Sequence, residues 1–177
     1  RIPNEQRRIA KANIQSLLVS CKSGPLGNLK ENGMDKKTLY ALMNGNPGMH
    51  LATVENGEPR VRAILLYSAG DDGIIFHTGT QKDLSRQISE NPGCEMCFND
   101  FAQGIQVRVR GTLEEITDPA FKDRIAETPG REFLKKWRDS GELAGFYGAI
   151  RVVTLKGGIA HVWSMETNFA TKEPITL

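Results

Sequence analysis

Hydrophobic positions follow helical spacing in some parts of the chain and strand-like alternation in others. In the first 20 residues, Ile14, Leu17 and Leu18 recur at helical intervals among basic side chains, which predicts an amphipathic helix. A second helical pattern begins after Asp35, a residue type that caps helix N-termini, and extends to about Asn44. Both helices therefore precede the first strand-like segment.

Short strands separated by turn-forming residues make up most of the chain after residue 48. Asn56-Gly57 and Gly70-Asp-Asp-Gly73 are typical of hairpin turns, and Gly157-Gly158 joins the last two strands. We expect strands over residues 49–55, 60–68, 73–78, 94–100, 105–116, 146–155 and 158–165. Helices are expected over residues 82–90 and, after Asp118-Pro119, to about residue 139.

Helices are inserted between these strands at irregular intervals. A doubly wound parallel sheet needs regular alternation, so the pattern favours an α+β protein built on an antiparallel barrel. Turn-forming residues cluster just before Met34. We predict an N-terminal basic helix and linker over residues 1–33 and one barrel domain over residues 34–177. The sequence leaves several alternatives open for residues 1–33. This segment packs on the domain, moves freely, reaches a partner subunit, or is an addition to the native protein.

The charge of the chain divides at the same place. Of 23 basic and 21 acidic side chains, residues 1–33 hold six and two, and residues 34–177 hold the other 17 and 19. The body is therefore mildly acidic, and a nucleic-acid partner is not expected. Hydrophobic runs such as residues 63–67 are far shorter than the ~20 residues that a membrane-spanning helix needs. We therefore expect no membrane partner either.

Three cysteines at scattered positions do not form a disulfide framework, and we predict a cytoplasmic protein. Cys94 and Cys97 have the spacing of metal and redox motifs. However, no second cysteine pair or histidine cluster completes a zinc site, and the pair falls in a predicted strand. Side chains three positions apart on a strand face opposite ways. We therefore interpret both as structural thiols and predict no metal site.

Two arginines at the start of the second strand form the first candidate anion site. Arg60 and Arg62 are two positions apart, so both project from one face of the strand. If that face lines a barrel, burying two cations is costly unless a bound phosphate or carboxylate offsets their charge. The alternative is a solvated strand face, which needs no ligand.

A second candidate lies where the third strand passes through Gly79 into a helix. Hydroxyl and free backbone N–H groups gather near Thr78 and Thr80, and Lys82 falls in the first helical turn. A lysine there opposes the helix dipole unless an anion is bound. The alternative is a plain helix cap through Thr80. We assign His77 a structural or surface role.

The third candidate is the strand that begins at residue 105. Gln106, Arg108 and Arg110 share one face, and aliphatic side chains share the other. Such a strand can form the wall of a ligand cavity, a dimer interface or an ordinary two-faced strand. This segment alone does not decide between them.

Together, the three segments resemble a known family. The order is Pro59-x-x-Arg62, then Phe76-x-Thr78 with Lys82-Asp83, Gln87 and Asn91-Pro92, then Gln106-Val-Arg-Val-x-Gly111. It resembles the pyridoxamine 5′-phosphate oxidase-like, FMN-binding split-barrel family from about Met34 to the end of the chain. The resemblance implies a six-stranded antiparallel Greek-key split β-barrel with flanking helices, and a homodimer that holds FMN at its interface.

The resemblance also implies roles for particular residues. Arg62 and Lys82 would bind the FMN phosphate, with Thr78 beside them. Gln106 would reach the flavin from the partner subunit. The isoalloxazine ring would be flanked by the backbone of Ala63, Ile64 and Leu65. Further cofactor-binding candidates are Arg60, Arg108 and Trp163.

One departure narrows the expected activity. True pyridoxamine phosphate oxidases end with an Arg-x-His element, which this chain lacks after Trp163. We therefore expect an FMN-dependent oxidoreductase that resembles flavin reductases or nitroreductases, with NAD(P)H as electron donor and an unidentified acceptor. No side chain stands out as a general acid or base. This fits a flavin enzyme, in which the flavin carries the redox chemistry.

Two alternatives stay open. The first is a non-catalytic FMN-binding, electron-transfer or stress-related flavoprotein. The second is a split barrel that binds a deazaflavin or haem, with His50, His77 and His161 as candidate axial ligands.

Overall fold

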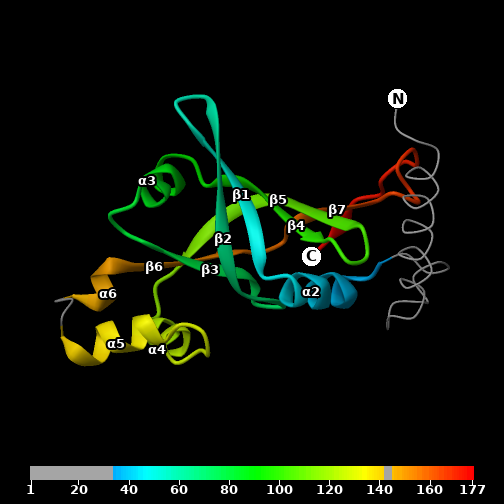
Figure 1. Cartoon of the computed structure of the whole chain (residues 1–177). Helices are drawn as coiled ribbons and strands as arrows, with labels where there is room; N and C mark the ends of the chain where they lie inside the picture. The colour runs from blue at the N-terminus through cyan, green and yellow to red at the C-terminus, as the bar shows by residue number, and fades with distance from the viewer. Residues whose placement is uncertain (1–33, 142–144) are drawn as a thin grey trace, which may run out of the picture.

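The computed structural model describes residues 34–141 and 145–177, which contain eight strands and five helices (Figure 1). The helix and linker predicted over residues 1–33 lie outside the described residues. The strands are β1 (Gly48–Glu55), β2 (Glu58–Gly70), β3 (Gly73–Gly79), β4 (Gly93–Asp100), β5 (Ile105–Ile116), β6 (Ile150–Leu155), β7 (Ile159–Ser164) and β8 (Ile175–Thr176). The helices are α2 (Lys36–Gly45), α3 (Asp83–Glu90), α4 (Pro119–Ala126), α5 (Glu132–Ser140) and α6 (Phe146–Ala149).

Six strands close into an antiparallel barrel. They follow the order β4, β1, β2, β3, β6 and β5, and β4 completes the ring by pairing with both β1 and β5. β7 pairs with residues 105–110 of β5 and β6 pairs with residues 113–116, so these two strands follow one another along one edge of β5. The predicted α+β split barrel with flanking helices is therefore confirmed.

The chain bends between β6 and β7 at Gly157 and Gly158. Gly157 has a φ of +62°, which favours glycine. A Cβ on Gly158 would lie 2.4 Å from Leu155 Cδ2 and 2.8 Å from Val109 Cγ1. The bend therefore depends on both glycines.

β2 pairs with a different strand in each part of its length. β1 pairs with residues 58–65, whereas β3 joins only from Leu66 onward, after which the register shifts. β3 pairs with β6 over residues 74–79. Residues 58–65 of β2 therefore keep one backbone edge that no strand of the described chain covers, and the β1–β2 hairpin projects from the barrel (Figure 1).

Hydrophobic side chains from alternate strand positions fill the barrel, among them the fully buried Phe76 and Phe98. α2 packs Leu39, Leu42 and Met43 against this core. A second hydrophobic cluster lies between the outer face of β3 and β6 and the helices α4, α5 and α6. Among the described residues, no helix is long and apolar enough to cross a membrane.

One local prediction is wrong. Residues 146–149, predicted as strand, form the short helix α6 after Gly145, which has a φ of +84°. The helical region predicted after Asp118 consists of two helices, because Pro129-Gly130 interrupts the helical pattern and Gly130 has a φ of +81°. The short strand β8 was not predicted.

Candidate functional site

Arg62 of β2 is held by polar groups from β1, β2 and α3. Its Nη1 donates to Thr53 Oγ1 at 2.6 Å, and its Nη2 donates to Gln87 Oε1 at 2.7 Å. Longer contacts from Nη1 reach the carbonyl oxygens of Leu51 and Arg60, at 3.5 and 3.3 Å. Thr53 and Gln87 are only 2% and 3% exposed. The guanidinium group is therefore anchored against a buried polar pair.

The two arginines of the first candidate site differ in their charge partners. Arg60 lies 2.9 Å from Glu55 and 3.0 Å from Glu58, so its charge is already neutralised. Glu55 accepts hydrogen bonds from Arg60 and Arg86, and these lower its pKa to about 2. Arg62 forms no ion pair within the described chain, and burial lowers its pKa from the ordinary value. Of the two, only Arg62 keeps its charge available to a ligand.

Lys82 is the N-cap residue of α3, one position before the first turn in which it was expected. Its exposed side chain makes no ion pair with the described residues, and its stem passes close to Gly79, where an added Cβ would lie 3.6 Å from Lys82 Cγ. No side chain caps α3, and Thr80 Oγ1 instead donates to Ala149 O at 3.5 Å. A helix start with open N–H groups and an adjacent lysine can bind an anion.

The open edge of β2 lies beside Arg62. Residues 58–65 pair with β1 on one side only, so alternate backbone N–H and C=O groups are available on the other. Val61 and Leu65 project from the face opposite to Arg62 and are 66% and 53% exposed. Ala63, between them, is exposed as well. Such a segment can bind the polar rim of a flat ring through its backbone.

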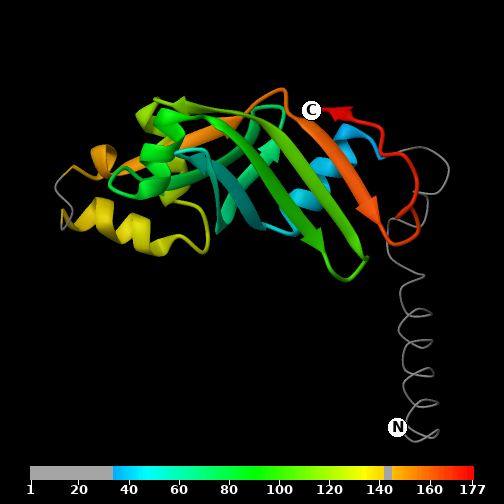
Figure 2. The same ribbon diagram turned by 90° about the horizontal axis from the view of Figure 1, so that it is seen from above.

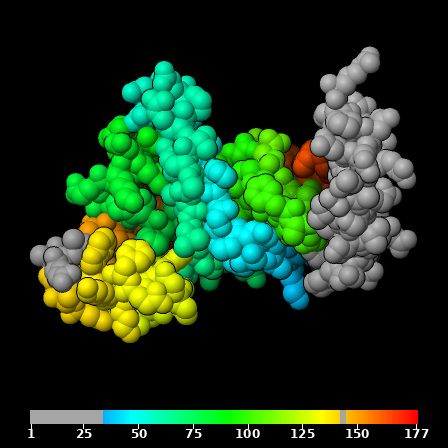
Figure 3. All heavy atoms as spheres, in the orientation of Figure 1, coloured from blue at the N-terminus to red at the C-terminus, as the bar shows by residue number. Residues whose placement is uncertain are grey.

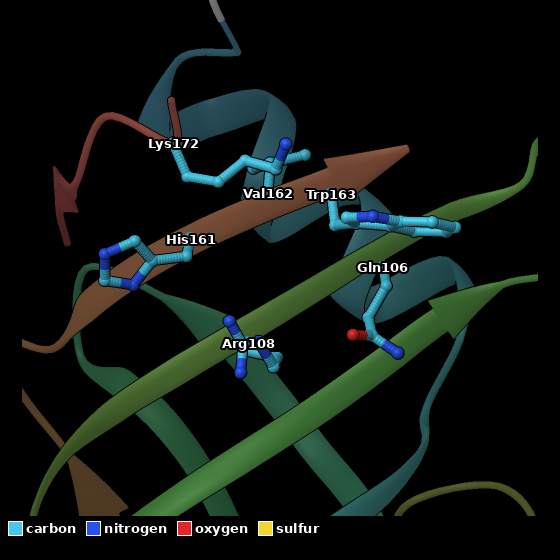
Figure 4. Close-up of a pocket in the computed structure, with 6 residues that line it drawn as sticks. All are labelled: Gln106, Arg108, His161, Val162, Trp163 and Lys172. Carbon is cyan, nitrogen blue, oxygen red and sulfur yellow. The ribbon is translucent and has the colours of Figure 1, made fainter. Parts of the chain in front are cut away.

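A surface pocket of ≈ 310 Å³ lies over β5 and β7 (Figure 4). Gln106 of β5 is directly opposite Trp163 of β7, and Arg108 is opposite His161. Lys172 reaches the pocket from the segment that follows β7. The pocket is lined by Gln106, Arg108, His161, Val162, Trp163 and Lys172.

Hydrogen bonds orient two of the side chains that line this pocket. Gln106 Nε2 donates to Asn99 Oδ1 at 2.9 Å, and Trp163 Nε1 donates to Asn168 Oδ1 at 2.9 Å. The Trp163 ring and the Gln106 amide lie side by side in Figure 4. The pair can therefore contact a planar polar group.

The cations of this pocket already have partners. Arg108 lies 3.5 Å from Glu95 across the β4–β5 pair. Lys172 Nζ donates to three backbone carbonyl groups of residues 167–170. The pocket therefore offers a ligand the indole ring of Trp163 and the amide of Gln106, and little unpaired charge.

The predicted site residues fall into two groups at opposite ends of the folded molecule. α3, which Lys82 precedes, lies at one end, and β7 lies at the other (Figures 1 and 2). In Figure 3 the β1–β2 hairpin stands between α3 and the β4–β5 strands. Thr78 belongs to the first group and is buried on the strand that leads to α3. One chain therefore brings Arg62, Lys82 and residues 63–65 near α3, and it places Gln106, Arg108 and Trp163 elsewhere.

A buried cation that no sequence pattern marks lies in the first group. Arg131 is 4% exposed; its Nη2 donates to Leu66 O at 2.7 Å, and its guanidinium lies 5.7 Å from the centroid of the Tyr67 ring. Burial, together with the charges of Arg131 and Lys82, lowers the pKa of His77 to about 4. His77 Nδ1 and Arg131 Nε are buried without a hydrogen-bond partner in the described chain.

Cys94 and Cys97 face opposite sides of β4, as predicted. Cys94 packs against the barrel core, and burial raises its pKa to about 12. Burial also raises the pKa of Cys97, which faces outward opposite Arg108. No group of three or more potential metal ligands occurs within residues 34–141 and 145–177.

The sequence profile of the pyridoxamine 5′-phosphate oxidase family matches residues 36–156. A pyridoxine/pyridoxamine 5′-phosphate oxidase of Acidothermus cellulolyticus is 35% identical over 95 residues, which are 53% of this chain and 42% of the relative. The corresponding protein of Agrobacterium fabrum is 31% identical over 121 residues, which are 67% of this chain and 59% of the relative. The chain thus spans about half the length of these relatives.

Solved structures share the fold at low sequence identity. A NimC/NimA family protein of Clostridium acetobutylicum has a TM-score of 0.62 and 19% identity, over 85% of this chain and 98% of the other. A pyridoxamine 5′-phosphate oxidase-related, FMN-binding protein of Nostoc punctiforme has a TM-score of 0.60 and 16% identity, over 89% of this chain and 98% of the other. Both alignments extend over most of this chain and nearly all of the solved structure.

Proposed function

Since the chain belongs to the pyridoxamine 5′-phosphate oxidase family, we propose that it is an FMN-dependent oxidoreductase whose flavin lies between two copies of the chain. One observation carries this proposal: two cations without ion-pair partners in the described chain adjoin α3, Lys82 as its N-cap and Arg62 through Gln87, and Arg62 lies on the open-edged part of β2. A phosphate group and an attached planar ring fit these two features together.

The phosphate end of FMN would be bound by Arg62 and Lys82. A phosphate monoester is a dianion near neutral pH, so it compensates both cations. The uncapped start of α3 adds backbone N–H groups that favour the same ligand. Arg60 is already paired with Glu55 and Glu58, and we assign it no direct contact with the phosphate.

The ring end would lie along residues 63–65 of β2. The isoalloxazine ring has hydrogen-bonding groups on one rim and two apolar faces. The open edge of β2 offers backbone groups to that rim, and exposed Ala63 and Leu65 offer apolar contacts. When bound, the flavin supplies the redox chemistry, and the chain's residues bind it and orient it.

The remaining contacts would come from Gln106 and Trp163 of a second copy. Gln106 and Trp163 belong to β5 and β7, and β7 lies at the other end of the molecule from α3 (Figures 1 and 2), so we assign these two contacts to the second copy. Exposed apolar side chains border each half: Val61 and Leu65 on β2, and Phe101, Met165 and Phe169 near the pocket, the last three 88%, 71% and 99% exposed. Exposed apolar patches of this kind favour an interface between copies.

The reaction that we propose is reduction of a small acceptor with NAD(P)H as electron donor. His77 lies on β3, the strand that leads to α3, and its pKa of about 4 makes it a weak base at pH 7. The proposed role of the chain is therefore binding and orientation of the flavin, not proton transfer by a side chain.

A non-catalytic flavoprotein is the second candidate function. The pocket over β5 and β7 is shallow and offers little free charge, which suits an electron-transfer surface as well as a substrate site. Steady NAD(P)H oxidation in the presence of a nitroaromatic or free flavin would favour the enzyme. A single reduction without turnover would favour the carrier.

The decisive experiment is identification of the bound cofactor. We expect purified protein to carry FMN, or to bind added FMN, with the absorbance bands of an oxidised flavin. Mass spectrometry of the released ligand would distinguish FMN from a deazaflavin or haem. Protein that stays colourless after incubation with FMN would refute the proposal.

A further inference from the structure

Arg62 uses one edge of its guanidinium group for its short contacts within the chain. Thr53 Oγ1 accepts from Nη1 at 2.6 Å, and Gln87 Oε1 accepts from Nη2 at 2.7 Å. Thr53 Oγ1 also donates to Gln87 Oε1 at 2.8 Å. The two acceptors are therefore adjacent, and together they bind the edge formed by Nη1 and Nη2.

The hydrogen bonds among these three side chains have one consistent direction. The Thr53 hydroxyl gives its only proton to Gln87, so it can receive one from Arg62. Gln87 also contributes to the lowered pKa of Glu55. Gln87 Oε1 therefore accepts hydrogen bonds from both Thr53 and Arg62.

The second edge of Arg62 is left for a ligand. Its Nε–H and the other Nη2–H donate no hydrogen bond to the described residues, and these two donors have the spacing that binds a phosphate group in a bidentate manner. Thr53 and Gln87 are almost fully buried, whereas Arg62 is only partly buried. The open edge therefore faces away from the buried pair.

We propose that Thr53 and Gln87 are positioning residues that hold Arg62 with its Nε–Nη2 edge toward the phosphate of FMN. The inference rests on the proposed function and names the part of the site that distinguishes FMN from riboflavin, which lacks the phosphate. An arginine that is ordered before binding loses less conformational freedom when the ligand arrives. Phosphate affinity therefore depends on two residues that do not touch the phosphate.

Glu55 supports this arrangement from the same strand. It lies two positions after Thr53, on the same face of β1, and its negative charge acts on Arg62 through space. Its carboxylate accepts hydrogen bonds from Arg60 and Arg86, not from Arg62. Within the described chain, Arg62 therefore has no acidic hydrogen-bond partner.

The test compares FMN with riboflavin on matched variants. Thr53→Val removes the hydroxyl at nearly constant size, Thr53→Ser keeps it, and Gln87→Met removes the amide. Dissociation constants for both flavins come from quenching of flavin fluorescence. We expect the preference for FMN over riboflavin to fall by about five- to tenfold in Thr53→Val and Gln87→Met, because Arg62 loses a charge-assisted contact. Thr53→Ser should retain it within about twofold.

Thr154→Val is the matched control. Thr154 is a buried threonine of β6 whose Oγ1 donates to Asp72 O at 3.0 Å, with no contact to Arg62. Its loss should lower the melting temperature and leave the preference for FMN unchanged. In an Arg62→Ala background, Thr53→Val should cause no further loss of preference.

The outcomes separate this inference from the proposed function. A wild-type protein that prefers FMN, with the same preference in Thr53→Val and Gln87→Met, would overturn the inference alone. Equal weakening of FMN and riboflavin in those variants would also overturn it, because it would indicate a structural role. Wild-type protein that binds no flavin would overturn both.

Discussion

The α3 end of the folded molecule and the β5–β7 end carry similar residue types, but their cations differ in whether they have partners within the chain. Near α3, Arg62 and Lys82 have no acidic partner in the described chain, and neutral buried side chains support Arg62. Over β5 and β7, Arg108 pairs with Glu95, and Lys172 bonds to backbone carbonyl groups. Because an unpaired, partly desolvated cation is costly, its presence indicates a ligand, whereas a paired cation needs none. Charge therefore favours anion binding at the first end, and shape favours ring contact at the second.

The largest expected effect is loss of phosphate binding at the α3 end. Arg62→Ala combined with Lys82→Ala should weaken FMN binding by on the order of 100-fold or more, since each removes a charge-assisted bond of ~1.5–3 kcal/mol. Riboflavin binding should change little. Isothermal titration calorimetry with FMN and with riboflavin measures the two dissociation constants.

The matched change at the other end is Arg108→Ala combined with Lys172→Ala. Both cations already have partners, so we expect a less than about threefold change in the preference for FMN over riboflavin. If this variant lost the preference for FMN as strongly as Arg62→Ala/Lys82→Ala, the two ends would not differ in phosphate binding.

The next effect is on stability and pH, through His77. Its pKa is lowered from 6.5 to about 4 in the folded chain, so the unfolded chain binds more protons between these values. Stability should therefore be fully present above about pH 7 and fall by up to about 3 kcal/mol as the pH drops toward 4. Urea unfolding across this range measures the slope.

His77→Gln should flatten this part of the pH profile, whereas His50→Gln, a change at an exposed position on β1, should leave it unchanged. The charges of Lys82 and Arg131 contribute to the lowered pKa. Bound FMN should raise the pKa of His77, because its phosphate offsets the charge of Lys82. A pH profile identical with and without FMN would argue against a phosphate at this end.

A small effect is also expected from Arg60. Arg60→Met removes surface ion pairs with Glu55 and Glu58, and such pairs contribute little because water screens them. FMN affinity should fall by less than about fivefold, with Glu55 still engaged by Arg86. Fluorescence titration would show this, and a loss as large as that of Arg62→Ala would make Arg60 a phosphate ligand instead.

The sequence predicts most of the barrel because its local signals agree with the tertiary structure. The helix after Asp35, the hairpin at Asn56-Gly57 and the alternation around Arg108 all occur as expected. The predictions fail at residues 146–149, where a hydrophobic segment suits strand and helix alike, and packing under α4 and α5 selects the helix.

The candidate site is less predictable than the fold. Alternation places Arg60 and Arg62 on one face, but only the β1–β2 register and the docking of α3 show that Arg60 meets Glu55 and Arg62 meets Gln87. Arg131 carries no local pattern, because its burial depends on a loop that folds back over β2. Such pairings are long-range, and residue spacing alone does not encode them.

The central claim is that one flavin site uses the α3 end of one copy and the β5–β7 face of another. The most direct measurement mixes two variants, Arg62→Ala/Lys82→Ala and Gln106→Ala/Trp163→Ala, after brief unfolding and refolding together. Neither variant alone should bind FMN tightly, and the mixture should regain part of the wild-type binding, because mixed pairs contain one intact site. A mixture that binds no more FMN than the separate variants would contradict the claim.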